Sequence, residues 1–331
     1  MNIRELLVNN LNPILDPAVI NMTPAQFIAE YGGNLSKIGL VVKPPSGRVY
    51  YDSATAPKNP VYGNFLKEFT KISSDIFEVY AVVNTLIDSY TAEDPKYSSF
   101  KSGGGNSSTH ICPSEKTVNY LAKILEEIAK YPVKGIILVG NTFINRNYCF
   151  CDNCKSEFSQ IAGIPPSFDF NRIQVDSDLQ SKWVMWRADK LSNMVAALAK
   201  RVKEVNEKIE VYSEIYLEPA VNYTENLELE YGQNIETLSR VAKIMFNVHP
   251  WTPILPEVNS VEYSKLIKSI TSVESLKRSG VKPALLYWNV ANEDELDIIK
   301  SISGKVSSGE VYTYNSYPLG YNQLRELHLG R

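Results

Sequence analysis

The chain holds four cysteines, and three of them stand close together in the segment NYCFCDNCKSEF, residues 147–158. Cys149, Cys151 and Cys154 have the spacing C-x-C-x2-C, and Cys112 lies upstream in THICPSEK. Four thiolates complete the tetrahedral coordination of Zn²⁺ and leave no open position for a catalytic water. The pattern therefore predicts a structural zinc site. The alternatives are four reduced thiols without a metal, and a redox role, which is disfavoured because we expect no C-x-x-C to open a helix in a thioredoxin-like setting.

A second chemical signal is the strand-like run VYSEIYLEP (211–219), in which mostly aliphatic residues alternate with tyrosines and glutamates. Successive side chains of a strand point to opposite faces, so Glu214 and Glu218 share the face opposite the aliphatic one. The aliphatic face suits the helix-facing side, so both glutamates should point toward the barrel interior or its mouth. A glutamate inside a barrel must be paired or protonated, which makes Glu214 the leading candidate for catalysis or a key substrate contact. The alternative is a structural ion pair with a lysine such as Lys43.

The two glutamates cannot act together while they share one extended strand, because four residues separate them by roughly 13 Å. Glycosidase carboxylate pairs stand about 5–5.5 Å apart in retaining enzymes and about 6.5–9.5 Å apart in inverting ones. A partner for Glu214 would come from elsewhere. The available acids are Asp52, Asp88, and Glu218 if its loop folds back.

Amide and aromatic side chains recur at or near the predicted carboxyl ends of strands. Amides can each bind two hydroxyl groups, and an indole offers a flat platform for the apolar face of a sugar. The alternative is that asparagine merely ends strands and starts turns. His249 is a candidate for proton transfer or for a hydrogen-bonded position without chemistry. The candidates for carbohydrate binding are Asn84, Asn141, His249, Trp251, Trp288 and Asn289, with Lys43 and Asp52; Asn9, Asn247 and Asn315 extend the pattern.

Eight apolar, β-branched runs separated by helical patterns must position these residues. Eight strand–helix units predict an α/β fold, a (β/α)8 TIM barrel over residues 1–331 as one domain, with insertions after strands 3 and 4. The insertion after strand 3 contains 89–108, which reads as a long loop, and helices are expected over 117–131 and 181–206. An open doubly wound sheet is disfavoured because no glycine-rich turn follows the first run. The runs are 3–9, 37–43, 77–84, 135–141, 210–218, 243–249, 283–290 and 310–317.

The stretch from His110 to Phe158 resembles the corresponding stretch of glycoside hydrolase family 42 β-galactosidases and their uncharacterised glycosyl-hydrolase-like relatives. In that family a cysteine before the third helix and a C-x-C-x2-C after the fourth strand bind zinc in a TIM barrel. The resemblance implies the same fold and the same zinc ligands here. It covers about residues 109–160.

The family also implies two catalytic glutamates, and this chain departs from it at both places. The acid/base glutamate should follow Asn141, where the sequence has Thr142, and a hydroxyl cannot replace a carboxylic acid as proton donor. The nucleophile should end the seventh strand, where Asn289 stands; the nearest acid, Glu293, reads as a helix start.

Bulk properties exclude several classes of function. The net charge is −3, and the basic residues are scattered, which argues against nucleic acid or an anionic membrane as a partner. No stretch has transmembrane length, and the start MNIRELLVNN lacks the apolar core of a signal peptide. A cytoplasmic location is therefore the default expectation, and in a reducing cytosol four cysteines are poor disulfide candidates, so clustered ones point toward metal or catalysis. The sequence leaves a homo-oligomer open.

These signals predict a divergent glycoside hydrolase-like protein that acts on or binds a carbohydrate at the carboxyl-terminal face of the barrel. Its enzymatic status is open. The competing hypothesis is a catalytically inactive carbohydrate-binding or scaffold barrel with a structural zinc. A lyase or isomerase of a phosphorylated metabolite is disfavoured because no glycine-rich loop follows strands 7 and 8.

Overall fold

The barrel predicted from the sequence is present in the computed structural model. The structure describes residues 3–165, 167–216, 227–247, 283–287, 296–297, 300, 303–304 and 309–314. Eight parallel strands close in the order β1-β10-β9-β8-β7-β6-β3-β2. Their bounds are β1 Asn12–Leu15, β2 Lys37–Lys43, β3 Glu78–Asn84, β6 Gly135–Val139, β7 Glu210–Tyr216, β8 Lys243–Asn247, β9 Ala284–Tyr287 and β10 Val311–Tyr314.

The position of the first strand differs from the sequence prediction. Residues 3–9 do not form it: Ile3–Val8 is helix α1, and the strand is the shorter segment Asn12–Leu15. The buried residues Ile3 and Leu6 are three apart, which is the spacing of one face of a helix. A short apolar run cannot be assigned from periodicity alone. Asn9 consequently follows a helix and does not end a strand.

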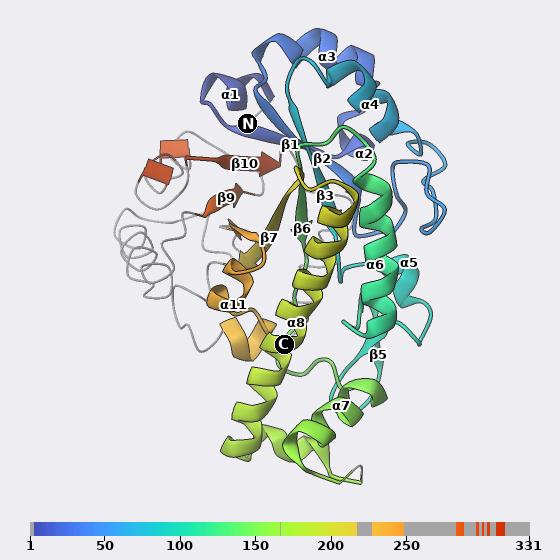
Figure 1. Cartoon of the computed structure of the whole chain (residues 1–331), viewed down its shortest axis with the longest axis vertical. Helices are drawn as coiled ribbons and strands as arrows, with labels where there is room; N and C mark the ends of the chain where they lie inside the picture. The colour runs from blue at the N-terminus through green and yellow to red at the C-terminus, as the bar shows by residue number, and fades with distance from the viewer. Residues whose placement is uncertain are drawn as a thin grey trace.

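Helices cover the outside of the barrel (Figure 1). The two long ones, α6 (Glu115–Ile128) and α8 (Ser177–Val205), lie side by side and match the predicted helices closely. Ser114 caps α6 as its sequence suggests, with its hydroxyl accepting the N–H of Thr117. Among the described residues, no helix combines the length and hydropathy needed to cross a membrane. The others are α2 Pro17–Ile20, α3 Pro24–Tyr31, η1 Gly32–Asn34, α4 Phe65–Ser73, the π-helical turn η3 Leu227–Tyr231 and α11 Ile235–Ser239.

The two predicted insertions are structured. The stretch 89–108 is not a plain loop: it holds the short helix α5 (Ser89–Ala92) and most of an antiparallel hairpin of β4 (Ser98–Phe100) and β5 (Asn106–Ile111). The insertion after β6 contains α7 (Asp152–Ala162) and the 3-10 turn η2 (Phe170–Gln174). The insertion after β6 lies beside the first half of α8, and the insertion after β3 lies beside α6, where Thr91 of α5 contacts Tyr120 (Figure 1).

Three tyrosines define which side chains face the barrel interior. The ring of Tyr80 on β3 contacts Tyr212 on β7 and Tyr312 on β10, with centroids 6.0 and 5.7 Å apart. Since β6 separates β3 from β7, and β1 and β2 separate β3 from β10, these rings can meet only inside the barrel. Residues two positions further along β7 and β10 share that inward face and lie nearer the carboxyl-terminal end. Those residues are Glu214 and Tyr314.

Candidate functional site

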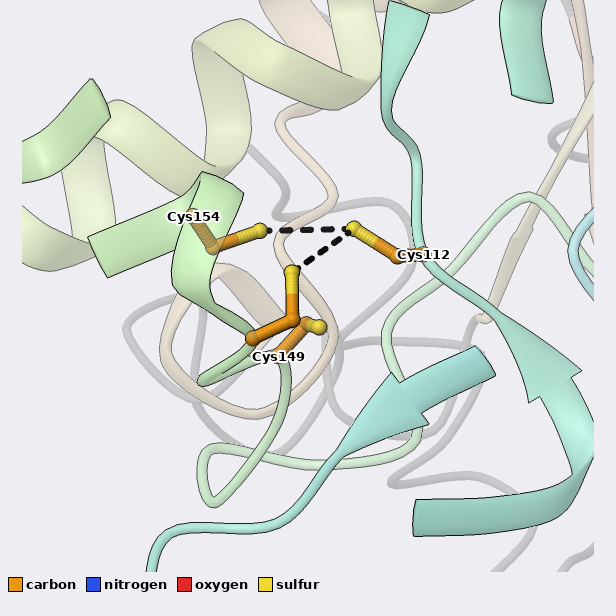
Figure 2. A group of neighbouring side chains, drawn as sticks. Cys112, Cys149 and Cys154 are labelled. Carbon is orange, nitrogen blue, oxygen red and sulfur yellow. Dashed lines mark hydrogen bonds between the residues drawn. The ribbon is translucent and has the colours of Figure 1, made fainter. Parts of the chain in front are cut away.

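The four cysteines form one cluster at the carboxyl-terminal side of the barrel. Their sulfur atoms all lie within 4.8 Å of one another, and Cys112 Sγ is 3.5 Å from Cys151 Sγ and 3.4 Å from Cys154 Sγ. Figure 2 shows Cys112, just beyond β5, pointing toward Cys154 on α7. The insertions that follow β3 and β6 thus meet at this cluster.

The cluster fits a tetrahedral metal. With Zn–S bonds of about 2.3 Å, four sulfurs around zinc stand about 3.8 Å apart, close to the separations seen here. The backbone N–H of Phe100 points at Cys149 Sγ, 3.4 Å away, an arrangement that stabilises a thiolate. The four cysteines are free of disulfides. Cys151 is also the N-cap of α7, so Cys151 and Cys154 do open a helix, although in a closed barrel and not in a thioredoxin-like setting.

A buried arginine lies near this cluster. Arg187 on α8 is fully buried, donates to the main-chain oxygens of Asn145 and Glu230, and packs its guanidinium over the ring of Phe143. Burial lowers its pKa to about 9, although the negative charges of Glu230, Cys149 and Cys154 oppose that shift. A cation without solvent needs nearby negative charge, and Glu230 and the cysteines Cys149 and Cys154 can supply it.

Aromatic packing holds the cysteine-rich segment 149–158 on α8. The ring of Phe150 stacks on Trp183 at 4.7 Å, and Phe158 of α7 meets the same indole edge-on at 4.8 Å. Trp183 and Trp186 are buried core residues, as the sequence indicates. The α8 helix therefore serves two structures, the barrel wall and the insertion that carries three of the cysteines.

Glu214 lies inside the barrel near its carboxyl-terminal end and is only 1% exposed. Its Oε2 accepts the backbone N–H of Gly140 at 2.6 Å, and its Oε1 accepts the side-chain amide of Asn247 at 2.6 Å. Burial raises its pKa to about 7, while the two hydrogen bonds act in the opposite direction. A carboxyl group with this pKa can give and take a proton near neutral pH.

The expected lysine partner of Glu214 is engaged elsewhere. Lys43 Nζ forms an ion pair with Asp88 Oδ2 at 2.9 Å and donates to the main-chain oxygen of Asn84. The amide of Asn84 in turn donates to the main-chain oxygen of Lys43. The alternative reading of Glu214 as the partner of Lys43 is therefore wrong. No ion pair joins Glu214 within the described part of the chain.

Residues after β6 complete the neighbourhood of Glu214. The amide of Asn141 donates to Ser213 Oγ at 2.8 Å and to the main-chain oxygen of Glu214 at 3.1 Å. Its own Oδ1 is buried and has no hydrogen-bond partner among the described residues. Thr142 is also buried, and its hydroxyl donates to main-chain oxygens of Phe143 and Tyr231. Glu214 thus places a carboxylate beside Gly140, just before the position where the family glutamate is missing.

Asp16 is a carboxylate that the sequence analysis missed. It follows β1 directly, is 1% exposed, and accepts hydrogen bonds from the N–H of Ala18 and the hydroxyl of Tyr50 through Oδ1. Its Oδ2 is buried and has no partner among the described residues. Burial raises its pKa, against those two hydrogen bonds. The missed signal is the segment NPILDP, an apolar pair ending in an acid and a proline, obscured by placing the first strand at 3–9.

The remaining candidates fall into two groups. Asp52 is exposed on the loop after β2 and pairs with Lys58 at 3.2 Å, so the structure does not bring it to Glu214. Several others lie outside the described residues: Glu218, His249, Trp251, Trp288, Asn289, Glu293 and Asn315.

No protein-family model matches the sequence, and neither does any curated protein sequence. Solved structures share the fold of this chain, the TIM barrel that is also found in glycoside hydrolases. The chain is similar to the glycoside hydrolase domain of PgaB (BpsB) from Bordetella bronchiseptica, with 16% identity, a TM-score of 0.67, and coverage of 96% of this chain and 99% of that one.

Two further structures share the architecture. The catalytic domain of β-amylase from Paenibacillus polymyxa has 12% identity and a TM-score of 0.62 over 97% of this chain and 98% of that one. A β-galactosidase from the psychrophilic Marinomonas ef1 has 9% identity and a TM-score of 0.63 over 93% of this chain and 54% of that one. At these identities the likeness establishes the fold.

Proposed function

We propose that this protein is a divergent glycoside hydrolase that binds a carbohydrate at the carboxyl-terminal mouth of the barrel and uses Glu214 as its proton donor. The observation that carries the proposal is a fully buried carboxyl group inside the barrel, with a pKa of about 7 and two hydrogen-bond donors in place. A general acid at neutral pH needs such a pKa. Asn84 ends β3, Asn247 ends β8, and Asn141 lies two residues beyond the end of β6, so these amides would be available to sugar hydroxyls at this end of the barrel.

The first experiment measures hydrolysis of a panel of 4-nitrophenyl glycosides by wild type and Glu214→Gln. We expect turnover of at least one glycoside and a loss of about 10²- to 10⁴-fold in the variant. The loss should be larger for the phenyl glycoside of the same sugar, because its poorer leaving group depends more on protonation. Glu236→Gln, on the exposed side of α11, is the matched control and should keep wild-type rates.

The second candidate function is carbohydrate binding without catalysis. It is favoured by Thr142, a buried hydroxyl where related enzymes would have their acid. Calorimetry with the sugars of the panel separates the two functions. Binding without turnover of any glycoside would support the binding protein and contradict the hydrolase.

We also propose that the four cysteines hold one structural Zn²⁺ per chain and that the zinc loop reflects kinship with family 42. The close sulfur cluster, the N–H of Phe100 and the buried Arg187 support the zinc. The reduced cysteines would suit a cytoplasmic protein. Metal analysis should give about one zinc per chain for wild type and for the control Asn153→Ser, and much less for Cys151→Ser. Equal zinc in both variants would contradict this site.

A further inference from the structure

Asp16 and Glu214 stand on opposite walls of the barrel. Asp16 follows β1 and Glu214 lies on β7, and three strands separate β1 from β7 in either direction around the closed sheet. Two carboxylates in this arrangement face one another across the interior if both side chains point inward.

The inward direction of Asp16 follows from its neighbours. Lys37 of β2 reaches the ring of Tyr80, so Lys37 and Gly39, two residues on, face the interior. A Cβ on Gly39 would lie 2.7 Å from the side chain of Ile14, which places Ile14 on the inner face as well. Asp16 is two residues beyond Ile14 and still has extended backbone angles, φ −102° and ψ 115°. It therefore points into the same end of the barrel as Glu214.

Tyr314 is a buried phenol that lies near both acids. It lies on β10, where its neighbour in register on β1 is Ile14, and it is fully buried on the inner face. Burial raises the pKa of Tyr314 far above its ordinary value, and the negative charges of Glu214 and Asp16 both add to that shift. One phenol is thus within electrostatic reach of both carboxylates.

We propose that Asp16 is the second catalytic carboxylate of this site and acts as the general base opposite Glu214. The inference rests on the proposed hydrolase function. The buried Oδ2 of Asp16 is an acceptor that has no donor among the described residues, and a substrate water would supply one. Carboxylates from opposite walls favour the wider spacing of about 6.5–9.5 Å that admits a water molecule, and hence inversion at the anomeric carbon.

The reaction balances with one water. Protonated Glu214 gives its proton to the glycosidic oxygen as the bond from that oxygen to C1 breaks, and the leaving group departs as an alcohol. The water oxygen bonds to C1 while one of its protons passes to the carboxylate of Asp16. Exchange with solvent then removes the proton from Asp16 and protonates Glu214 again.

The test uses the aryl glycoside that wild type hydrolyses. Asp16→Asn keeps an oxygen for the N–H of Ala18, so the cap of α2 and the thermal stability should be retained. We expect kcat/KM to fall by about 10²- to 10⁴-fold, equally for phenyl and 4-nitrophenyl leaving groups, because a base does not assist departure. In Asp16→Ala, sodium azide should restore turnover and give the glycosyl azide of inverted configuration, because azide needs no deprotonation.

The outcomes separate this inference from the function on which it rests. If Asp16→Asn keeps activity within about threefold while Glu214→Gln loses it, Asp16 is not the base and the hydrolase proposal stands. If NMR shows retention at the anomeric carbon, the role of Asp16 as general base is wrong. If wild type hydrolyses nothing in the panel, both proposals fail together. Glu236→Gln again serves as the control.

Discussion

Lys43 Nζ lies 2.9 Å from Asp88 Oδ2, and neither side chain exposes any surface. The lysine comes from the end of β2, and the aspartate comes from the insertion that follows β3. Lys43 is the lysine that the sequence suggested as an alternative ion-pair partner of Glu214, and Asp88 neutralises its charge instead. Glu214 is therefore buried without a cation beside it in the described part of the chain, and burial is free to raise its pKa.

Removing the charge of Asp88 should destabilise the protein strongly. Asp88→Asn leaves Lys43 buried without a counter-charge, while the asparagine still caps α5. We expect the free energy of unfolding to fall by about 3–5 kcal/mol in urea denaturation. The matched control is Asp52→Asn, which breaks an exposed ion pair with Lys58 and should cost less than about 1 kcal/mol. Similar losses in both variants would contradict this account.

The same pair should make stability fall in acid. Burial alone would raise the pKa of Asp88, but Lys43 and the hydrogen bonds from Thr91 outweigh it and hold that pKa below 3.8. A lowered folded-state pKa contributes stability above the unfolded value, and this contribution is lost as pH falls through the folded value. The stability difference between wild type and Asp88→Asn should therefore shrink between pH 5 and pH 2. A difference that does not change with pH would show that folding does not lower the pKa of Asp88.

Glu214 should have the opposite pH dependence. Its pKa rises from 4.5 to about 7 on folding, so the folded chain holds a proton that the unfolded chain releases in this range. Wild type should therefore lose stability relative to Glu214→Gln as pH rises from 4.5 to 7, by roughly 3 kcal/mol in total. Urea denaturation at several pH values measures the difference, with Glu236→Gln as the control. A constant difference would mean that Glu214 is charged throughout.

Metal removal should be visible in tryptophan fluorescence. Phe150 lies between Cys149 and Cys151 and stacks on Trp183, so loosening the thiolate cluster should disturb that indole. Incubation with a strong chelator should change the emission of wild type and lower its melting temperature by several degrees. Cys151→Ser should show neither response. An unchanged wild type whose zinc has been removed would mean that the metal does not hold the loop.

Gly47 should resist substitution because of Asp88. Its φ is +76°, and a Cβ there would lie 2.0 Å from Asp88 Oδ1. Gly163 provides a matched control, because its φ of +68° carries the same backbone penalty but its Cβ would meet open space. Gly163→Ala should cost about 1–2 kcal/mol, and Gly47→Ala should cost clearly more. Equal costs would show that Asp88 can move away from the new methyl group without loss of stability.

Some elements could be predicted from the sequence and others could not, and the reasons are physical. The run 210–218 was assigned to a strand, and its alternation placed Glu214 on the inner face, because side-chain direction in a strand has a period of two. The first strand was misassigned because NPIL is only four residues long and the helix α1 beside it is equally apolar. That error concealed Asp16. The hairpin of β4 and β5 was missed because its residues are mostly polar and glycine-rich.

The sequence by itself determined the barrel, the candidate cysteine cluster and the inward direction of Glu214, since each depends on local spacing or on a count of repeated units. Only the tertiary structure decided that Lys43 pairs with Asp88, that Arg187 lies buried near the cysteine thiolates, and that Asp16 stands across the barrel from Glu214. These relationships join residues far apart in the chain. They depend on which strands become neighbours and how the barrel closes, and no local pattern encodes that.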